Sequence, residues 1–333
     1  MPELPEVETL VRDLRATVVG RTITEARVAP DAPRLVQRMP VEVFTSGLRD
    51  RRIERVERRG KFVLVGLSPQ LQGGQMAAPT RHSRRSSQND KVVDMWWVAH
   101  RRMSGNFLLR PHSAPDEPFI RARFRLDDGN ELRFVDLRKF GTMTLVDDPQ
   151  PLLADLGPEP LDASFTADAL AAILKKRNAP VKAVLLDQGA IAGIGNLYAD
   201  EALHDAKVHP LRVARSLKPD EVSRLRDGIV HALEQGLANL GSSVGHVVGG
   251  EEVSLRDHVN LNGQSGKNEE FLVAYGREGR PCRNCGTSIE RLKIGNRSAH
   301  YCPRCQPKPR RPLARKRTEP KVSGKKAAAV RKR

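Results

Sequence analysis

The chain has 333 residues, a formal net charge of +17 and a sequence pI near 10.2. This length provides for two domains with sizeable cores, and the basic balance indicates a polyanionic partner such as nucleic acid. No apolar run reaches the roughly 18 residues that span a membrane and no signal peptide is evident, so we expect a cytoplasmic protein without a membrane partner.

The positive charge is concentrated near the C-terminal end of the sequence. Residues 306–333 contain twelve Lys or Arg and one acid, which leaves a net charge of only +6 on the other 305 residues. This stretch is rich in Pro, Ala and Lys and has almost no large apolar residue. We therefore predict a disordered basic tail, which either binds phosphates without sequence preference or only keeps the protein soluble.

The first residues combine a possible nucleophile with a neighbouring carboxyl group. Pro2 is small enough to favour removal of Met1, which would expose a secondary amine. An α-amino group has an unperturbed pKa of about 7.7–8.0, so a useful fraction is neutral near pH 7 and attacks electrophilic carbon. Glu3 would give or take a proton beside it. An N-terminal Pro-Glu is also common in proteins where it has no catalytic role.

A helix is predicted to follow directly. Pro5 suits its first turn, where the missing N–H has no cost, and Gly20 ends the pattern. Apolar residues recur at helical spacing between them, at Val7, Leu10, Val11, Leu14 and Val18. A buried helix of this kind would hold the N-terminus in place, as a terminal nucleophile requires.

The opening stretch PELPEVET resembles the N-terminus of the formamidopyrimidine-DNA glycosylase family, bacterial enzymes that remove oxidised purines from DNA. The related endonuclease VIII branch usually has Gly in place of Leu4, so the resemblance favours the oxidised-purine branch. It implies that Pro2 is the nucleophile, that Glu3 transfers a proton, and that the protein works on DNA in the bacterial cytoplasm.

Residues 21–67 read as short strands connected by turns. Alternating and β-branched residues at 22–24, 41–44, 52–56 and 61–65 favour a sandwich or barrel over βαβ units. Lys61 opens the last of these strands, and taken alone it is a solvated lysine. The segment ERRGKFVLVGL, however, is similar to a family segment whose lysine reaches the lesion, which implies that Lys61 assists proton transfer during strand cleavage.

The polar, Gly- and Ser-rich stretch 68–92 lacks periodicity and is predicted to be a flexible insertion. Family members usually pass directly into the next strand at this point. The insertion either only lengthens a hairpin loop or brings Arg81, Arg84 and Arg85 to DNA.

The next strand, 94–99, leads into a turn that contains Met103. This position resembles the family's methionine, which helps to fill the gap left when the damaged nucleotide leaves the stack. Two departures from the family pattern are visible nearby: Arg101 stands in place of the usual Leu, and Phe119 in place of a histidine that contacts DNA. Residues 119–126 and 131–135 form a predicted hairpin.

The segment DLRKFG after this hairpin combines two residue types that suit an opened duplex. Guanidinium planes and aromatic rings stack with bases, and an apolar wedge holds a kinked duplex open. The match to the family's DxRKFG loop implies that Arg138 contacts the base opposite the lesion and that Phe140 intercalates. The structural alternative is a surface loop with a buried Phe.

From residue 152 the pattern becomes helical. A linker at 157–160 precedes predicted helices at 165–176, 181–187, 196–206 and 219–240. The segment LLDQGAIAGIGNLYADEAL resembles the family's helix–two-turn–helix motif, whose glycines would let a phosphate approach backbone amides. The resemblance implies that Asn196 and Arg177 bind backbone phosphates. Residues 241–270 contain six glycines and are predicted to be a mobile loop, which in the family covers the flipped base.

All four cysteines of the chain lie within 24 residues, in the spacing of a tetrahedral zinc site rather than of disulfides: Cys282, Cys285, Cys302 and Cys305. Four thiolates leave no open coordination position, so one structural zinc ion is predicted, locking a hairpin too small for its own core. The segment KIGNRSAHYC matches the family's zinc-finger loop, which implies that Arg297 contacts a phosphate and assists the second elimination. A solvated charge is the alternative.

These patterns predict an α+β protein of two domains: an N-terminal β-sandwich with an N-terminal helix, and a helical helix–two-turn–helix domain with a zinc-finger hairpin. The expected boundaries are 2–150, 151–270, 271–306 for the zinc finger and 307–333 for the tail.

The resemblance implies a monomeric DNA glycosylase and apurinic/apyrimidinic lyase that acts on oxidised purines in damaged double-stranded DNA. Its Schiff base on Pro2 would lead to β,δ-elimination without a redox cofactor or catalytic metal. An oxidised-pyrimidine glycosylase of the endonuclease VIII type and a non-catalytic zinc-containing DNA-binding protein are the alternatives, although the latter has no use for Pro2 beside Glu3.

Overall fold

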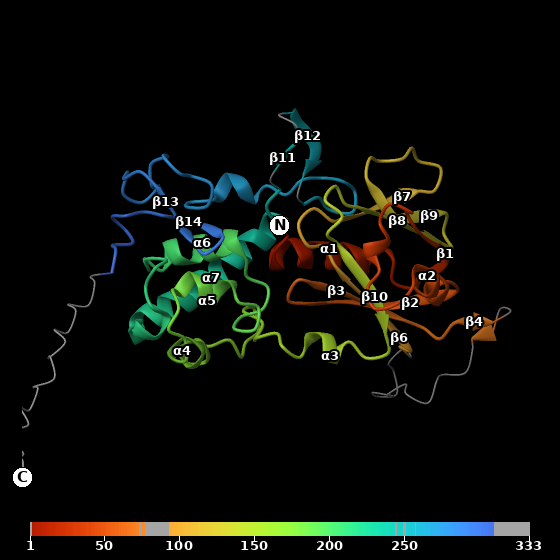
Figure 1. Cartoon of the computed structure of the whole chain (residues 1–333), viewed down its shortest axis with the longest axis horizontal. Coiled ribbons are helices and arrows are strands. Elements are labelled where there is room, and N and C mark those ends of the chain that lie inside the picture. The colour runs from red at the N-terminus through yellow and green to blue at the C-terminus, as the bar shows by residue number, and fades with distance from the viewer. Residues whose placement is uncertain are drawn as a thin grey trace, which may run out of the picture.

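Two hydrophobic cores, one among β-strands and one among helices, divide the computed structural model into two bodies that lie side by side (Figure 1). The structure describes residues 2–72, 75–76, 93–243, 245–248, 251–256 and 258–309. None of the helices in these ranges is both long enough and apolar enough to cross a membrane. The predicted α+β class with two domains is confirmed.

Eight antiparallel strands build the N-terminal body in the order β10-β6-β3-β2-β1-β8-β9-β7. They are β1 (Thr22–Val28), β2 (Arg51–Arg59), β3 (Phe62–Leu67), β6 (Met95–His100), β7 (Asn106–Pro111), β8 (Ile120–Leu126), β9 (Asn130–Val135) and β10 (Thr142–Val146). The short pair β4 (Leu71–Gln72) and β5 (Gln75–Met76) stands apart from this sheet.

The sheet folds at the junction of β1 and β2, where the register pairs only Thr22 with Arg52 and Ile23 with Arg51. The ring of Trp97 on β6 then lies 4.4 Å from that of Phe124 on β8 and 5.9 Å from that of Phe107 on β7, between centroids. The two halves therefore face one another across a shared core, as a sandwich requires.

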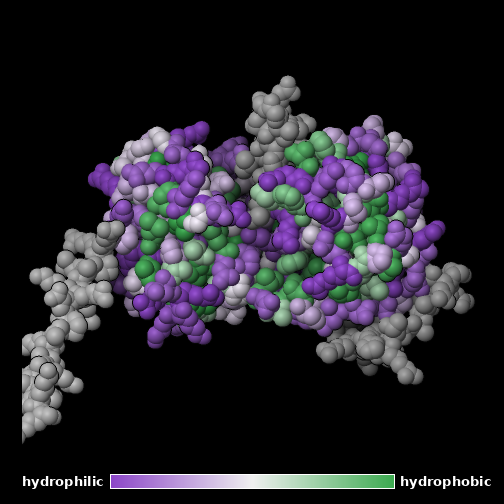
Figure 2. All heavy atoms as spheres, viewed as in Figure 1, coloured by the Kyte–Doolittle hydropathy of each residue, from purple (hydrophilic) through white to green (hydrophobic). Residues whose placement is uncertain are grey.

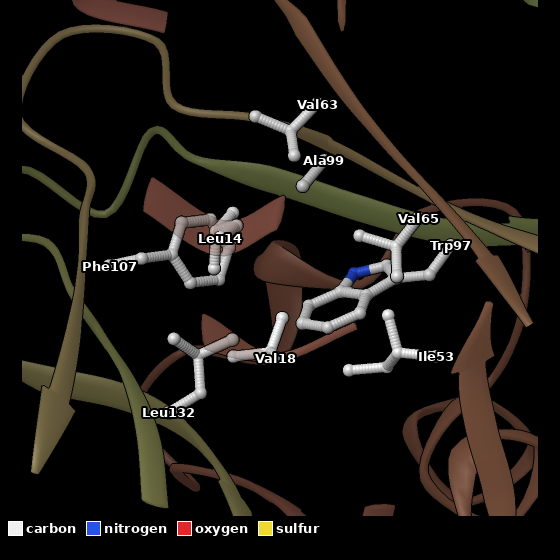
Figure 3. Close-up of a pocket in the computed structure, with 9 residues that line it drawn as sticks. All are labelled: Leu14, Val18, Ile53, Val63, Val65, Trp97, Ala99, Phe107 and Leu132. Atoms are coloured by element: carbon white, nitrogen blue, oxygen red, sulfur yellow. The ribbon is translucent and has the colours of Figure 1, made fainter. Parts of the chain in front are cut away.

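Helix α1 (Leu4–Thr17) lies against this core, and a cavity of about 10 Å³ remains where it meets the sheet (Figure 3). Only apolar side chains and Trp97 line it: Leu14, Val18, Ile53, Val63, Val65, Trp97, Ala99, Phe107 and Leu132. The Trp97 indole N–H is buried there and has no hydrogen-bond partner among the described residues. A water needs two to four polar partners, so this site is suited to remain dry.

The predicted strand at 41–44 is wrong, because the structure forms helix α2 (Val41–Leu48) there. Alternation of Val41 and Val43 suggested a strand, yet Val43 is 53% exposed. Phe44 and Leu48 are both fully buried, and residues four apart share one face of a helix. Burial of that pair decides the local structure.

The C-terminal body contains the predicted helices with small shifts at their ends. They are α4 (Ala167–Lys175), α5 (Val181–Leu186), α6 (Asn196–Asp205) and α7 (Pro219–Ala238), after a short α3 (Gln150–Leu153). Three 3₁₀ turns complete the described helical segments: η1 (Pro33–Leu35), η2 (Ala214–Ser216) and η3 (Asn268–Phe271). The zinc-finger hairpin pairs β13 (Glu290–Ile294) with β14 (Arg297–Tyr301) and contacts α6.

Two segments predicted to be flexible are partly ordered. Ser68 is buried, and the Gln70 amide donates to two carbonyls near α2, so the proposed insertion begins in a fixed segment. Residues 77–92, with the three arginines named above, lie outside the described residues, as do 310–333 of the tail.

The stretch 241–270 is not a single loop. It contains the hairpin of β11 (Gly245–Val248) and β12 (Glu251–Arg256), and its following residues pack into the protein. Asn268 is buried and donates to the Ser242 hydroxyl at 2.9 Å. Its glycines and polar residues suggested mobility, but these hydrogen bonds satisfy the polar groups internally.

Helix α1 joins the two bodies. Leu4 at its first position belongs to the helical core, whereas Val7, Leu10 and Leu14 belong to the core of the sheet. The residues just before α1 are therefore held at the junction of the two bodies, where α6 begins.

Candidate active site

Glu3 is the N-cap of α1 and faces the N-terminus of α6. Its buried carboxylate accepts hydrogen bonds from the backbone N–H groups of Gly195 at 2.6 Å, Leu197 at 2.9 Å and Tyr198 at 3.4 Å. The first amides of a helix favour a negative charge. Glu3 is thereby fixed in one position by a second, distant helix.

The glycines before α6 serve this contact. A Cβ on Gly195 would lie 2.4 Å from the Glu3 carboxyl carbon, and one on Gly193, whose φ is +87°, would lie 2.7 Å from Leu4. We expected these glycines to admit a phosphate. Instead, the space beside these glycines is filled by Glu3 and Leu4. The Glu3 carboxylate accepts the three amide N–H groups that a phosphate would otherwise bind.

Burial raises the pKa of Glu3 above its ordinary value, although the Lys61 ammonium and the Leu197 amide act in the opposite direction. Desolvation disfavours the charged form, so it increases the protonated fraction. A carboxyl group in this state is suited to donate a proton near neutral pH.

Lys61 lies in the turn just before β3 and is also buried. Its ammonium donates to the Ile194 carbonyl at 2.9 Å, directly before the amides that hold Glu3. Burial lowers the pKa of Lys61; Glu3 and Glu6 oppose this effect, and the Arg297 guanidinium lowers the pKa further. Lys61, Glu3 and Arg297 therefore share one electrostatic environment.

Pro2 is buried at the start of this arrangement. The next residue, Glu3, donates its backbone N–H to the Glu6 carboxylate at 2.8 Å, which closes a capping box at the start of α1. Glu6 also accepts the Tyr198 hydroxyl at 2.7 Å and the Ser242 N–H at 2.8 Å. The backbone that carries Pro2 is therefore held from both bodies.

The two loops predicted to contact the opened duplex are joined to each other. Met103 lies half-buried in the turn after β6, and its neighbour Ser104 donates to the Asp136 carboxylate at 2.5 Å. Asp136 in turn accepts the N–H groups of Arg138 and Gly141.

The tip of the second loop is exposed. Phe140 has half its surface open to solvent, and the Arg138 guanidinium stacks over its ring at 4.9 Å from the centroid. The alternative of a buried Phe is therefore wrong. A cation and an aromatic ring stacked at a surface suit contacts with bases.

Arg177 and Asn196 belong to the helical motif, and Asn196 stands between the two residues whose amides bind Glu3 at 2.6 and 2.9 Å. The Arg177 guanidinium pairs with Asp187 at 3.0 Å, and both side chains are more than 40% exposed. Arg177 also lines an open pocket of about 240 Å³ with Lys176 and Gly189. Asn196 opens α6, and its buried side-chain oxygen has no hydrogen-bond partner within the part of the chain that the structure describes.

The four cysteines meet the requirements of a zinc site. Their Sγ atoms all lie within 4.8 Å of one another, with 3.4 Å between Cys285 and Cys302 and 3.9 Å between Cys282 and Cys305. A disulfide needs about 2.05 Å, whereas tetrahedral Zn–S bonds of about 2.3 Å separate sulfurs by about 3.8 Å. The set fits one structural zinc ion.

The zinc hairpin is docked onto the helical motif by a buried ion pair. The Lys182 ammonium donates at 2.6 Å both to Asp200 on α6 and to the Ser298 carbonyl on β14. Asp200 also accepts the His300 N–H at 3.0 Å. This network fixes the hairpin, and with it Arg297 at the exposed start of β14, relative to α6.

Hydrophilic side chains gather where the two bodies meet on the face shown in Figure 2. Sequence reasoning found Pro2, Glu3 and Lys61 near this junction but missed Glu6, Tyr198 and His258. Their signal was weak because Glu6 reads as an ordinary first-turn acid and Tyr198 as a core aromatic. Only their contacts across the two bodies identify them.

Comparisons with known proteins agree along the chain. Residues 1–143 match the family model of the formamidopyrimidine-DNA glycosylase N-terminal domain, residues 156–247 the H2TH domain of the same enzyme, and residues 279–308 a zinc finger found in FPG and IleRS. The curated formamidopyrimidine-DNA glycosylase of Bacillus cereus is 38% identical over 313 residues, which cover 92% of this chain and all of that protein.

Two solved structures cover 92% of this chain and all of their own, each with a TM-score of 0.75. One is a MutM in complex with DNA containing carbocyclic 8-oxo-G, at 30% identity, and the other is the Lactococcus lactis Fpg with DNA containing an oxidised pyrimidine, at 29%. Together the three domain matches, the curated relative and the shared fold show that this chain belongs to the formamidopyrimidine-DNA glycosylase family.

Proposed function

We propose that the protein is a base excision repair enzyme that removes oxidised purines from double-stranded DNA and then cleaves the strand. The observation that carries this proposal is the position of Glu3, a buried carboxyl group with a raised pKa directly beside Pro2. A protein that only binds DNA has no need of this pair. The curated relative, a formamidopyrimidine-DNA glycosylase, supports the same reaction class.

The first step is base release. With Met1 removed, the neutral Pro2 amine attacks C1′ of the damaged nucleotide while Glu3 protonates the sugar ring oxygen. The bond from C1′ to the base breaks and its electron pair leaves with the base, which takes up a proton. The amine loses a proton as the opened sugar becomes an iminium linked to Pro2.

The second step breaks the strand twice. The iminium acidifies the C2′ proton, so loss of that proton expels the 3′ phosphate by β-elimination, and δ-elimination then expels the 5′ phosphate. Lys61 is the proposed proton carrier because it is buried, shares its surroundings with Glu3 and has a lowered pKa. Arg297 is proposed to hold a phosphate and to assist the second elimination.

Base release requires an extruded nucleotide, because the reacting carbon is out of reach within the duplex. Unstacking costs a few kcal/mol, and we propose that the linked turns with Met103, Arg138 and Phe140 offset it by filling the gap. Their connection through Ser104 and Asp136 supports concerted insertion.

The remaining proposed contacts position the duplex. Arg177 and Asn196 would bind backbone phosphates, and the hairpin that the structural zinc ion holds would present Arg297 to the same duplex. We propose damaged double-stranded DNA as the partner of a monomer in the bacterial cytoplasm. The proposed domain limits are 2–150, 151–270 and 271–306.

A nicking assay tests the proposed function. On a duplex with one 8-oxoguanine opposite cytosine, zinc-loaded protein should leave a one-nucleoside gap flanked by phosphates on both sides, as β,δ-elimination requires. Binding without cleavage would overturn the proposal in favour of a DNA-binding protein.

A second substrate class follows from one comparison. The Lactococcus lactis Fpg was solved with an oxidised pyrimidine, so we propose oxidised pyrimidines as secondary substrates. Competition between 8-oxoguanine and thymine glycol in matched duplexes decides the ranking. Faster excision of thymine glycol would assign the chain to the pyrimidine class.

A further inference from the structure

Arg101 is a fully buried arginine at the centre of the junction between the two bodies. It lies between β6 and β7, two residues before Met103, and is 1% exposed. In the sequence, Arg101 stands out only as a departure from the family pattern. The proposed chemistry does not use it, yet it is among the largest buried side chains in the described residues.

The Arg101 guanidinium connects three separate elements. It donates to the Gly105 carbonyl in its own turn at 2.6 Å, to the Asn106 side chain at the start of β7, and to the Glu6 carbonyl in α1 at 3.1 Å. It also lies 3.2 Å from Nδ1 of His258, which is 157 residues away in sequence. One side chain thus joins the Met103 turn, the start of α1 and the segment after β12.

The position of His258 fixes its protonation. Its Nε2 lies 2.9 Å from the Leu240 carbonyl, which only accepts, so Nε2 carries the proton. Nδ1 is then a free lone pair that accepts from Arg101, which always donates. Burial and the Arg101 charge hold the pKa of His258 well below its usual value, in agreement with this neutral tautomer.

The chain on both sides of His258 closes around the same point. The Ser243 hydroxyl donates to the His258 carbonyl, and the N–H of Val259 reaches the Asn106 side chain at 3.4 Å. Ser242 donates its N–H to the Glu6 carboxylate, which also holds the Glu3 backbone. In Figure 1 the β11–β12 hairpin projects above α1 from this point.

We propose that Arg101 and His258 are positioning residues that hold the Met103 turn in register with Glu3. This proposal rests on the proposed function and names two groups that set its geometry. A displacement of about 1 Å at a site remote from the reacting atoms lowers a rate by as much as about 100-fold. The contacts of Arg101 with the Glu6 carbonyl and with His258 prevent such a displacement among the turn, α1 and the segment after β12.

The consequence differs between the two reactions of the enzyme. A damaged base must be unstacked and replaced in the duplex before it is released, so its excision depends on the Met103 turn. A preformed abasic nucleotide has no base to extrude and depends on that turn much less. Loss of the Arg101–His258 contact should therefore slow excision selectively.

The test compares R101M with R133M in the full, zinc-loaded chain. Arg133 is a matched control because it is equally buried, but it pairs with Glu131 on β9 and Glu117 in the loop before β8 rather than with α1 or the segment after β12. R101M should lower the single-turnover rate of 8-oxoguanine excision roughly 10- to 100-fold and change cleavage of a preformed abasic site by no more than about twofold. R133M should leave the ratio of the two rates unchanged.

His258 variants test the contact itself. H258F removes the acceptor and should slow excision selectively, by no more than R101M, which also loses the bonds to Gly105, Asn106 and Glu6. H258Q retains one acceptor and one donor and should recover most of the excision rate. The double variant R101M/H258F should be no slower than the slower single variant, because both remove the same contact. The proposal is overturned if the rate loss of the double variant equals the product of the two single losses. It is also overturned if excision and abasic-site cleavage slow equally.

A measurement without DNA separates this proposal from the proposed function. Hydrogen–deuterium exchange should show faster exchange at Gly105, Ser242 and Val259 together in R101M, and not in R133M. If the wild-type protein excised no lesion, the proposed function would fail. The exchange rates of R101M and R133M would still decide whether Arg101 holds the turn in place. Unchanged exchange at Ser242 and Val259 in R101M would overturn it.

Discussion

Glu3 is the residue on which two opposing effects converge. Burial favours its neutral acid form, whereas three backbone amides at the start of α6 and the nearby Lys61 favour the carboxylate. The balance raises the pKa, which in the proposed mechanism keeps a proton available for the sugar. Replacing Glu3 with the uncharged isostere Gln removes the proton and the burial penalty at once.

E3Q should therefore lower the rate of base release by roughly 10²- to 10⁴-fold. Its stability relative to the wild type should increase as pH rises. A group with a raised folded-state pKa contributes stability that is present below its unfolded pKa and lost as pH rises through the folded value. Thermal melts from pH 4 to pH 8 should show E3Q and wild type close together in acid and E3Q more stable at higher pH.

E57Q provides the control for this series, because Glu57 is nearly half exposed on β2 and should leave the pH dependence unchanged. An E3Q variant that becomes less stable than wild type as pH rises would show that the amides of α6 outweigh burial.

His204 on α6 is a second residue with a defined partner. Its Nε2 lies 3.4 Å from Cys282 Sγ, so a ring N–H there donates to a zinc ligand. Partners of this kind orient the ligand and strengthen metal binding by about 10- to 100-fold. H204F should therefore release zinc to a chelator roughly tenfold faster, measured with a colorimetric zinc indicator. H231F, which changes an exposed histidine on α7, should match wild type; equal release from H204F would contradict the assignment.

At the scale of elements, the loop proposed to face DNA could be predicted from sequence because its residue types suit base contacts and because it matches a family loop. The family match of DLRKFG implies that Phe140 is a wedge, which stays a prediction; the structure shows that Phe140 is exposed and that Arg138 stacks over its ring. F140A should reduce excision of 8-oxoguanine about 10-fold or more, because the unstacking cost of a few kcal/mol is no longer offset. Its melting temperature should stay near that of wild type, since half the ring is already in solvent.

V43A is the matched control for this loss, because Val43 is a comparably exposed apolar residue on α2. It should retain full excision. If V43A and F140A slowed the reaction equally, the wedge role of Phe140 would be rejected.

Other elements were beyond local sequence reasoning. The stretch at 41–44 alternates as a strand does, and only the tertiary burial of Phe44 and Leu48 makes it helical. The glycines before α6 were correctly placed at a helix start, but the group that approaches them is Glu3 from the opposite end of the sequence. The Arg101–His258 contact likewise joins residues 157 positions apart and has no local signal.

At the scale of the molecule, the two bodies are also joined by Glu159 after α3. Its carboxylate accepts from Arg58 at 2.7 Å, from Arg59 at 2.8 Å and from the Gly60 N–H at 2.6 Å. Burial raises the pKa of Glu159, but Arg58, Gly60 and Arg59 together hold it below its usual value. These contacts fix the turn before Lys61 against the helical body.

E159Q should destabilise the protein by roughly 2 kcal/mol at neutral pH, because charged hydrogen bonds to two arginines are lost. A lowered pKa gives stability that is present above the unfolded value and lost as pH falls through the folded value. The difference between E159Q and wild type should therefore shrink in acid, as measured by urea unfolding at pH 7 and pH 3. A difference that grows in acid would contradict the ion-pair account.

The central claim is that Pro2 carries the covalent intermediate, with both bodies holding it beside Glu3. Borohydride reduction during reaction with an 8-oxoguanine duplex converts such an iminium into a stable amine, and mass mapping locates the attached sugar. We predict a crosslink on the peptide that begins at Pro2, without Met1. A crosslink on Lys61 or another lysine would contradict the account. The same holds if active, zinc-loaded protein gave no crosslink on oxidised-purine, oxidised-pyrimidine and abasic duplexes.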